Sequence, residues 1–538
     1  MPKYKIGLDF GTTNSIISYW EKDQLEAFQY GGENGTKYIP SFITYEDGFI
    51  EIGSGARTTA ANHPEVTSYG NFKMDLPLKN HFTNAYQPPQ NPTTVTADYL
   101  RELLLSCENE YSFTRQQGEI SGLVVSVPEI WQRDIYNTGR EQLQTLIADN
   151  LGLEKELIQL VSEPVAAAAY YAWETQRRNQ QENGEIFNGN LLVCDMGGGT
   201  FDVSLCRIYG DKKVEVLYFD GQGDKGLESA GVAFDRHCVR IAYTKKHGQP
   251  PDENSTEFMG LLREFESVKI AGHSKYTKKL KNYFKSPSDL AEQTLYTFSG
   301  GYTLTNAEVE QAFASIGEGI NRVLERVKHW MQNNNQTCDR LFFVGGFCQF
   351  YLVQKMILEA LQLEENSTEI DRTFNLINSA FAISYGACLI ANGLVNPTEI
   401  FVHSLGIVID TINNNAEVEP KLISIIEGGT NLDDLASVRF ADIPPLTAFK
   451  TDEPLTVTLW VDPQSRGKIF KEHLPNTVKL PLPSTDDQWR VGMRVNRSQV
   501  AYLVIEAVGK DKRTEYELGN VIAKMFPGFI LFEEDDVN

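Results

Sequence analysis

The stretch LLVCDMGGGTFDVSL (residues 191–205) brings together groups that can bind phosphate and metal. An apolar run ends at Asp195, a glycine turn follows, and Asp202 leads back into apolar residues. Glycines let successive backbone N–H groups point into a turn and form a concavity suited to phosphate. A carboxylate beside such a turn can hold a hydrated Mg²⁺ that neutralises the phosphates. The candidate phosphate-binding residues of this turn are Gly197, Gly198, Gly199 and Thr200.

A second stretch, GLDFGTTNS (residues 7–15), follows the same plan. Its apolar run ends at Asp9, a second candidate Mg²⁺ ligand, and a small-residue turn leads into another apolar run. Two such turns facing each other would bind a triphosphate between them; two tight hairpins with capping Asp and Thr are the alternative. The candidate residues of this turn are Gly11, Thr12, Thr13 and Asn14.

Two other phosphate-binding motifs carry less weight. No G-x-x-x-x-G-K-[ST] occurs, which excludes a P-loop nucleotide hydrolase. GQGDKG (residues 221–226) matches G-x-G-x-x-G but lacks the expected opening strand–helix–strand unit, so a hinge or phosphate-side loop is the better interpretation. Gly345 and Gly346 end a further apolar run and would let a base or sugar approach the backbone.

Two charged residues extend the candidate site. Glu163 immediately precedes Pro164, which favours a helix start, so its carboxylate either orients water or metal or pairs with the helix dipole. Lys73, in NFKMDLP, would by itself be interpreted as a solvated surface lysine.

Strand-type and helix-type patterns alternate through the first two-thirds of the chain, which predicts an α/β architecture with central sheets. Helices are predicted near residues 96–111, 139–152, 163–180, 256–270 and 306–333. Strands are predicted in KIGLDF, SIISYW, GLVVSVP, NLLVCDM, VSLCRI, VEVLYF and RLFFVGG.

Beyond residues 392–396 the helical periodicity fades and period-2 alternation begins. EPLTVTLWVDP, WRVGMRV and QVAYLVIEAV are typical strands, the last two joined by a predicted hairpin loop at residues 496–498. We therefore predict a nucleotide-binding domain at 1–394, a β-rich domain at 395–520 and a short acidic tail at 521–538. The similar sequences of the two turns predict a duplicated fold. One lobe is expected at about 1–187 and 376–394, and the other at about 188–375.

Composition narrows the class of partner. The net charge of -23 argues against a nucleic-acid binder, since phosphate contacts need a basic surface. The basic cluster at residues 275–285 is better interpreted as a solvated face. Seven cysteines without a C-x-x-C pair give no sign of a disulfide framework or structural zinc. No apolar run is long enough to span a bilayer and no signal-peptide pattern opens the chain, so we expect a cytoplasmic protein.

These motifs, taken together, resemble the 70-kDa heat-shock chaperone family of the actin-like ATPase superfamily. The resemblance rests on GLDFGTTNS, VVSVPEIW, LVSEPVAAAAYY, LLVCDMGGGTFDVSL, SAGVAFD and FFVGG, in the family's order, and covers residues 3–394. It implies two ribonuclease H-like lobes with ATP or ADP and Mg²⁺ in the cleft between them.

The resemblance also implies roles for single residues. Asp9 and Asp195 would hold Mg²⁺ through water, Thr200 would contact the γ-phosphate, and Asp202 would help order the site. Lys73 and Glu163 would position the attacking water. The residues implied to line the adenosine pocket are Gly231, Glu266, Lys269, Gly345, Gly346 and Gln349.

Several positions depart from the family pattern. Gln349 stands where the family usually has an adenine-stacking arginine, and the N-P-D-E segment is replaced by residues 378–381 (NSAF). Tyr136 replaces an arginine of the interdomain relay, and the leucine-rich linker is absent. ATP binding and slow hydrolysis remain expected, whereas coupling to a peptide site is not.

The β-rich domain resembles the family's peptide-binding domain through HSLGIVI, KLISIIEGGTNL and the late hairpin, without a helical lid. This lidless arrangement is similar to the divergent branch typified by the human A12 members. The resemblance implies unfolded or extended polypeptide, or a specific protein, as partner, with a J-domain co-chaperone or a nucleotide-exchange factor, and no nucleic acid or membrane. A nucleotide-gated scaffold with little turnover, an actin-like filament protein and a sugar kinase of the same superfamily are the alternatives.

Overall fold

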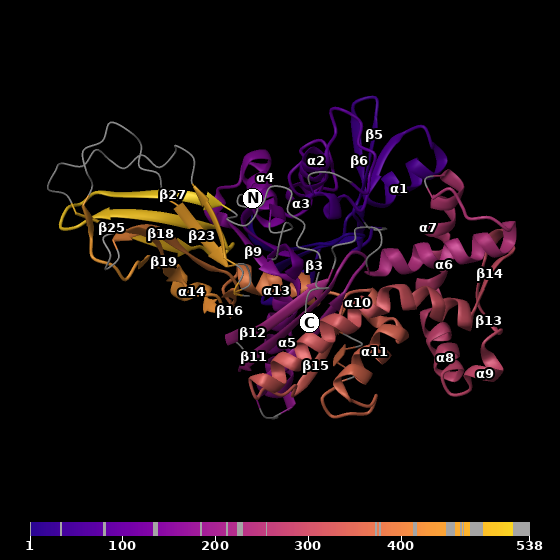
Figure 1. The fold of residues 1–538 in the computed structure, drawn as a ribbon. Helices are drawn as coiled ribbons and strands as arrows, with labels where there is room; N and C mark the ends of the chain where they lie inside the picture. Colours follow the sequence, from indigo (N-terminus) through magenta and orange to yellow (C-terminus); the bar gives the residue numbers. More distant parts are fainter. Residues whose placement is uncertain are drawn as a thin grey trace. The chain divides into compact units, whose positions relative to one another are not determined.

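The chain forms two compact units. The structure is a computed structural model and describes residues 2–519, apart from residues 33–34, 79–81, 133–137, 183–185, 211–212, 223–229, 254, 372–373, 376–377, 413–416, 448–457, 463–464, 466, 468 and 474–487. The N-terminal unit comprises Met1–Leu76, His81–Ile130 and Leu146–Pro397, and the C-terminal unit comprises Pro77–Asn80, Trp131–Thr145 and Thr398–Asn538. Figure 1 colours both units along the sequence.

The first sheet of the N-terminal unit mixes an antiparallel and a parallel half. Strand β1 pairs antiparallel with β2 and parallel with β8, so the strand that ends near Asp9 is central. Its order is β3 (Gln24–Ala27), β2 (Asn14–Glu21), β1 (Lys3–Phe10), β8 (Glu119–Val127) and β9 (Ile158–Ser162), with β4 (Ile39–Pro40) paired to β2.

The second sheet repeats this plan around Asp195. Strand β10 pairs antiparallel with β11 and parallel with β15, and its last seven residues are buried, as expected of a central strand covered on both faces. The order is β15 (Arg340–Val344), β10 (Asn188–Met196), β11 (Phe201–Tyr209), β12 (Lys213–Gln222) and β16 (Asn396–Thr398). In both sheets, therefore, a hairpin with an Asp near the end of its first strand lies beside a parallel strand.

Two helices cross closely between these sheets (Figure 1). Helix α5 (Glu163–Glu182) packs against the second sheet, and α13 (Ala382–Ala391) packs against the first sheet and against α5. A Cβ at Gly386 would lie 1.7 Å from the carbonyl oxygen of Ala166, so only glycine allows this crossing. Gly7 serves the same purpose on β1, where a Cβ would lie 2.2 Å from the backbone nitrogen of Cys388.

Capping residues define further helices of the N-terminal unit. Asn91 caps α2 (Pro92–Leu104) with Pro92 at its first position, and Thr305 caps α10 (Asn306–Asn333) in a capping box with Glu308. The other helices of eight residues or more are α1 (Gly53–Asn62), α6 (Ala230–His247), α7 (Thr256–Ala271), α8 (His273–Tyr283) and α11 (Tyr351–Leu361). A large buried cluster joins α6, α7, α10 and α11 to the second sheet.

Short elements complete the N-terminal unit. A three-stranded sheet is formed by β6 (Phe49–Ile52), β5 (Phe42–Glu46) and β7 (Thr67–Gly70), and a hairpin by β13 (Thr294–Phe298) and β14 (Tyr302–Thr305). The short helices are η2 (Phe72–Asp75), α3 (Phe113–Gln116), η3 (Glu129–Gln132), η5 (Lys155–Leu157), α9 (Pro287–Leu290), η7 (Ser299–Gly301) and η8 (Phe347–Gln349).

The C-terminal unit is built mainly from β-strands. One sheet orders β19 (Val418–Ile426), β18 (Ser404–Ile412), β23 (Thr458–Asp462) and β24 (Phe470–His473). The other orders β21 (Arg439–Phe440), β25 (Gln488–Val495), β26 (Ala501–Ala507) and β27 (Arg513–Gly519), with β22 (Leu446–Thr447) on β25. Both sheets contribute to a single cluster of buried apolar side chains. The unit also contains β17 (Ile400–Phe401), which pairs with β20 (Thr430–Asn431), and the short helix α14 (Leu432–Leu435).

The C-terminal unit also includes part of a helix from the first half of the chain. Helix α4 (Thr138–Leu151) starts in the segment Trp131–Thr145, which clusters with this unit. The Gln144 side chain donates a hydrogen bond to Ser498 (3.1 Å), and buried Arg140 lies 3.7 Å from Glu399. Nothing in the sequence pattern predicted this.

Most predicted elements are present with shifted ends. The helix predicted at 96–111 runs from Pro92 to Leu104, because Asn91 and Pro92 start it earlier than the apolar pattern suggests. The loop predicted at residues 496–498 is longer, extending to Val500, with Gln499 at a φ of 64°. Tyr136, most of GQGDKG and the acidic tail lie outside the described residues. Among the described residues, no helix is long and apolar enough to cross a bilayer.

Candidate functional site

The two glycine–threonine turns of the N-terminal unit touch each other. A Cβ built on Gly198 would lie 2.8 Å from Cγ2 of Thr13, and one built on Gly199 would lie 2.7 Å from Oγ1 of Thr12. Larger residues at these two glycines would force the turns apart. The two turns, which have similar sequences, therefore contact each other in the structure.

Hydrogen bonds to the backbone fix the first turn. The Ser41 hydroxyl donates to the Gly11 carbonyl (2.7 Å), and the Ser41 N–H donates to the Thr13 carbonyl (3.0 Å). The Arg57 guanidinium donates to the same Thr13 carbonyl (3.3 Å). Asn14 begins β2 and donates from its side chain to the Thr13 hydroxyl (3.4 Å). Because Ser41 and Arg57 bind the carbonyls of Gly11 and Thr13, the backbone of the first turn is held in place.

The start of helix α6 supports the second turn. The backbone N–H groups of Gly231 and Val232 donate to the carbonyls of Gly197 (3.2 Å) and Gly198 (2.9 Å). The Gly197 N–H donates to the Thr200 carbonyl (3.3 Å), which closes the turn on itself. The first amides of α6 therefore hold the turn rather than face a ligand directly.

Lys73 and Glu163 form a buried ion pair. Nζ of Lys73 lies 2.6 Å from Oε1 of Glu163, and the two side chains are 3% and 10% exposed. Glu163 is the first residue of α5 and Lys73 lies in η2. Lys73 is therefore not the solvated surface lysine that its motif alone suggests, and Glu163 stands at the start of a helix, as Pro164 indicated.

Asp9 lies next to this pair. Burial and the nearby Glu163 carboxylate raise the pKa of Asp9 to about 7, while Lys73 and a hydrogen bond from Ser126 act in the opposite direction. The Ser126 hydroxyl lies 3.2 Å from Oδ1 of Asp9, from the facing position of β8. An acid held partly protonated near neutral pH gains from a cation at its carboxylate.

Asp195 is the most strongly perturbed acid of the site. Burial, followed by the Glu163, Asp202 and Asp9 carboxylates, raises its pKa well above the ordinary value, and Lys73 opposes the shift. Asp202 is fully buried and faces Asp195 across the β10–β11 pairing. Among the described residues, Oδ2 of Asp195 is buried and receives no hydrogen bond.

These acids fit a hydrated Mg²⁺. Mg²⁺ keeps several waters and needs only one or two protein carboxylates beside substrate phosphates, and Asp9 and Asp195 supply two. The described part of the chain contains no group of three or more His, Cys, Asp or Glu that would cage a metal. Repulsion among Asp9, Asp195 and Glu163 and the bare oxygen of Asp195 both favour a cation here.

Gly345 brings the end of β15 against Asp195. Its φ is 80°, and a Cβ would lie 2.4 Å from Oδ1 of Asp195. Gly346 differs, because a Cβ there would meet nothing within 4 Å. The first glycine is required by the fold, and the second leaves open space.

Only some of the residues implied to line the adenosine pocket lie next to the second turn. Gly231 contacts both the second turn and Phe347, which follows the paired glycines. Lys269, on α7, pairs with Asp235 (2.6 Å), and its ammonium lies 5.1 Å from the Phe347 ring centroid. Burial raises the pKa of Asp235 to about 6, although Lys269 lowers it.

Glu266 and Gln349 are not joined to the turns by any described contact. Glu266 lies on α7, near enough to Asp235 to raise its pKa. The Gln349 side chain turns back to the protein and donates to the Phe343 carbonyl (3.2 Å).

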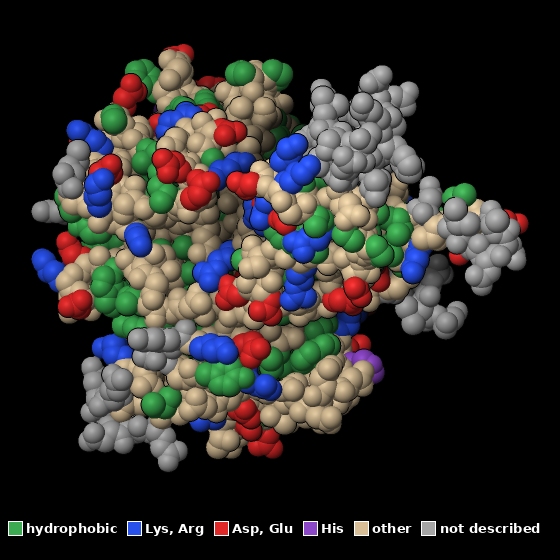
Figure 2. Space-filling view, turned by 90° about the vertical axis from the view of Figure 1, so that its left-hand side faces the viewer, with side chains coloured by type: hydrophobic (Ala, Val, Ile, Leu, Met, Phe, Trp, Pro, Cys, Tyr) green, Lys and Arg blue, Asp and Glu red, His purple; other side chains and the backbone are tan. Residues whose placement is uncertain are grey.

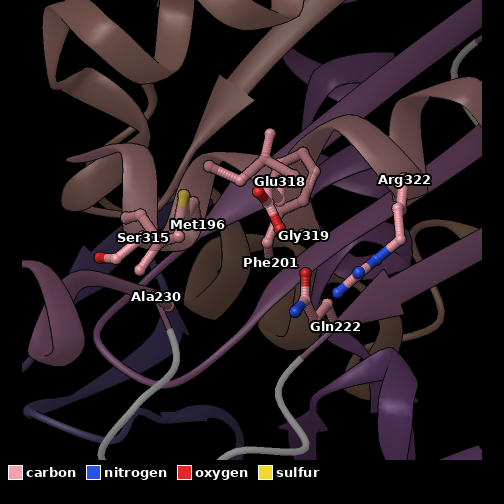
Figure 3. A pocket seen from close by; sticks show the side chains of 10 residues that line it. Met196, Phe201, Gln222, Ala230, Ser315, Glu318, Gly319 and Arg322 are labelled. Carbon is pink, nitrogen blue, oxygen red and sulfur yellow. The ribbon is translucent and has the colours of Figure 1, made fainter. Parts of the chain in front are cut away.

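A solvent-open pocket lies on the α10 side of the second turn (Figure 3). Met196 and Phe201, which flank the turn, form part of its wall, and Gln222, Glu318 and Arg322 point toward it. A Cβ at Gly319 would collide with the Gln222 amide, so the bare helix surface accommodates that side chain. The pocket contacts neither Asp9 nor Lys73 and is separate from the site above.

The basic cluster at residues 275–285 lies on and just after α8. Lys281 pairs with Glu365 (2.6 Å), and Lys279 donates to the Thr294 carbonyl (3.1 Å). On the face of the molecule shown in Figure 2, acidic and basic side chains are interspersed.

Sequence reasoning missed several residues that support the site. Ser41, Arg57 and Ser126 bind the first turn or Asp9, and Asp235 binds Lys269. The available signal for Ser126 was its place in VVSVPEIW, just before Pro128, on a strand that the structure pairs with β1.

Sequence comparisons relate the chain to proteins named as chaperones. The chain is similar to the chaperone protein DnaK of Thermotoga neapolitana, at 26% identity over 396 residues, which cover 72% of this chain and 59% of the relative. It is similar to the chaperone protein HscA homolog of Acinetobacter baylyi, at 24% over 411 residues (73% and 58%). It is also similar to the DnaK of Mycoplasma mycoides, at 24% over 450 residues (80% and 68%). The chain thus matches about three-fifths of the length of the first two relatives.

The family comparison covers most of the chain. The sequence model described as Hsp70 protein matches residues 5–74 and 81–411, which include both turns, Lys73, Glu163 and the strands that carry Asp9 and Asp195. Since the match extends well beyond half of the chain, the protein belongs to the Hsp70 family.

Proposed function

We propose that the chain binds Mg²⁺–ATP between two actin-like lobes of its N-terminal unit and hydrolyses it slowly to ADP and phosphate. The support is the contact between the Thr12–Thr13 turn and the Gly198–Gly199 turn, with the Lys73–Glu163 pair beside Asp9 and Asp195. The matching order of the two sheets supports a duplicated fold. Membership of the Hsp70 family supports ATP as the nucleotide.

Each residue of the candidate site would have a separate role in the proposed reaction. Asp9 and Asp195 would hold a hydrated Mg²⁺, which neutralises phosphate charge when bound. Thr200 would donate its hydroxyl to the γ-phosphate, and Asp202 would order the turn behind it. Lys73 and Glu163 would orient the attacking water, with the ammonium offsetting developing negative charge. Such a site acts by positioning and electrostatics rather than by a strong base, so turnover would be slow.

We propose that the β-rich C-terminal unit binds extended polypeptide or a specific protein partner. Among the described strands, β24 and β27 each lie at the edge of a sheet, where an extended peptide can add by backbone hydrogen bonding. The similar proteins are named chaperone proteins, which favours this class of partner. A J-domain co-chaperone or a nucleotide-exchange factor and a cytoplasmic location complete the proposal.

The contact between the two turns carries the proposal, and an ATPase assay tests it. Purified chain should release phosphate from Mg²⁺–ATP, and Asp195→Asn and Thr200→Ala should each reduce the rate sharply while the circular dichroism spectrum stays unchanged. The assay is repeated with a denatured model protein. If the chain is a chaperone, it should bind this protein, and phosphate release with and without it is compared. Equal phosphate release by both variants and the wild type would end the assignment as an ATPase.

A second candidate is a nucleotide-gated scaffold with little turnover. Its support is the loss of the family's coupling residues: Tyr136 stands where the family has a relay arginine, and residues 378–381 read NSAF instead of N-P-D-E. A scaffold would bind Mg²⁺–ATP with a normal dissociation constant and release no phosphate above background. Sedimentation with ATP would reveal an actin-like filament, and stimulation by a sugar would reveal a kinase.

A further inference from the structure

A buried carboxylate two residues after Lys73 has no role in the proposed reaction as described so far. Asp75 is completely buried and ends the short helix η2, which also carries Lys73. Its carboxylate accepts hydrogen bonds from the Thr83 N–H and hydroxyl, the Asn84 N–H and side chain, and the Tyr86 hydroxyl. A single acid thus joins η2 to residues 83–86.

Four of these five donors converge on one oxygen, Oδ2. The Thr83 hydroxyl, the Asn84 side-chain amide and the Tyr86 hydroxyl each lie 2.8 Å from it, and the Asn84 N–H lies 3.2 Å from it. A carboxylate can accept all of them, because both of its oxygens are acceptors. A carboxamide in its place would turn an N–H₂ group against a donor in either orientation. The network therefore selects Asp over the nearly isosteric Asn.

The same segment is attached to the chain before η2. The Asn84 side chain also donates to the Gly70 carbonyl (2.9 Å), and the Tyr86 ring stacks on Tyr69 at 4.9 Å between centroids. The Gln87 N–H donates to the Tyr69 hydroxyl (3.2 Å). Residues 69–70 and Asp75 are thus both held, with Lys73 between the two anchored points.

Held in this way, η2 presents two side chains to the candidate site. Lys73 reaches Oε1 of Glu163 at 2.6 Å, and Met74 lies against the second turn, 3.3 Å from where a Cβ at Gly199 would be. Phe72 packs against Phe10, whose ring centroid lies 6.1 Å away. Lys73 and Asp75 lie in the same short helix, η2. If Asp75 no longer fixed this helix, a small rotation of η2 would separate Lys73 from Glu163.

We infer that Asp75 is a positioning residue for Lys73: its carboxylate fixes η2 against residues 83–86 and so holds the ammonium against Glu163. The inference rests on the proposed function only where it concerns turnover. The placement of Lys73 can be measured without any nucleotide.

The test combines a double-mutant cycle with chemical labelling of Lys73. In the full chain, Asp75→Asn should lower kcat about tenfold or more, because small misplacements of a positioning group weaken catalysis strongly. The ATP dissociation constant should change little, since Lys73 is assigned to the water and not to ATP binding. In a Lys73→Ala background Asp75→Asn should have no further effect on kcat, because residues that act through each other are not additive.

Labelling separates this inference from the proposed function. Lys73 is nearly inaccessible in the wild type, so a water-soluble amine-acylating reagent should modify it slowly relative to exposed Lys278, as followed by peptide mass spectrometry. Asp75→Asn should raise the ratio of Lys73 to Lys278 modification by about tenfold, and Asn91→Ala, which removes the cap of α2, should not.

The outcomes are distinct. A raised labelling ratio in a chain without ATPase activity would keep Asp75 as the positioning residue and refute the proposed hydrolysis. An unchanged ratio in a folded Asp75→Asn chain, or kcat effects of Asp75→Asn and Lys73→Ala that multiply, would overturn the inference. Where Asp75→Asn fails to fold, Tyr86→Phe removes one of the five donors and should give the same shift in smaller measure.

Discussion

Nζ of Lys73 lies 2.6 Å from Oε1 of Glu163, and both side chains are buried beside the two aspartates of the paired turns. An ion pair removed from water is kept only when its geometry is good, and removing one partner leaves an uncompensated charge.

Glu163→Gln should lower the rate of ATP hydrolysis about a hundredfold, because Lys73 would lose the partner that aims it and the water would lose an acceptor. Single-turnover phosphate release checks this. Lys73→Ala should match it in rate and should also lower the free energy of unfolding by about 3 kcal/mol, since a buried carboxylate remains unpaired. The control, Lys278→Ala on the exposed side of α8, should change neither quantity. Wild-type turnover in Glu163→Gln would remove the pair from the mechanism.

Asp9→Asn should stabilise the nucleotide-free chain, and more so at high pH. The pKa of Asp9 is raised to about 7 by burial and Glu163, above its unfolded value of about 4, so the ionised form opposes folding. This penalty is absent below pH 4, grows between pH 4 and 7, and is complete above pH 7. The difference in Tm between variant and wild type should therefore widen from pH 5 to pH 8 in scanning calorimetry.

The control for this experiment is Asp47→Asn, on an exposed turn where the positive φ of 46° suits asparagine. Its Tm difference should stay flat across the same pH range. A flat profile for Asp9→Asn as well would mean that Asp9 is not held in the low-dielectric, acid-rich surroundings described above.

Gly345→Ala should cost about 2 kcal/mol or more of unfolding free energy and weaken nucleotide binding. The position has a φ of 80°, which disfavours a side chain, and its Cβ would push on Oδ1 of Asp195 at 2.4 Å. Gly346→Ala is the matched control for stability, because its Cβ meets nothing within 4 Å, and it should stay within about 0.5 kcal/mol of wild type. Urea unfolding of both variants measures this contrast, and equal losses would contradict the geometry.

The sequence predicted the paired turns and the helices near 163–180 and 306–333 because those signals are local. A strand ending on Asp195, three glycines and a returning strand form a continuous pattern, and the 306–333 helix has its cap and its apolar face within one segment. The roles of Lys73 and Glu163 came from the family resemblance instead. By itself, Lys73 matches any surface lysine, and its burial depends on Glu163, 90 residues away.

What could not be predicted depends on contacts between distant segments. The Asp75 network needs residues 83–86 to fold back, and the Lys269–Asp235 pair joins two helices. The packing of Arg140 and Gln144 within the C-terminal unit follows from no periodicity, because it joins residues more than 250 positions apart in the chain. The early start of α2 was in principle visible, since Asn91 and Pro92 form a recognisable cap.

Mg²⁺–ATP should raise the unfolding free energy by about 2.7 kcal/mol at a hundred times its dissociation constant, because it binds only the folded state. Chelating the metal with EDTA should remove most of this gain, since Asp9, Asp195 and Glu163 would then face the phosphates without a neutralising cation. Thermal shift with ATP, with ADP and with each nucleotide plus EDTA measures this dependence. Equal stabilisation with and without metal would place the nucleotide away from the two aspartates.

The central claim is that the paired turns bind Mg²⁺–ATP, and isothermal titration of Mg²⁺–ATP into wild type and Asp195→Asn tests it most directly. We predict one nucleotide per wild-type chain and at least about a tenfold loss of affinity in the variant, corresponding to about 1.4 kcal/mol. Absence of binding to the wild type, or equal affinity in both proteins, would contradict the claim.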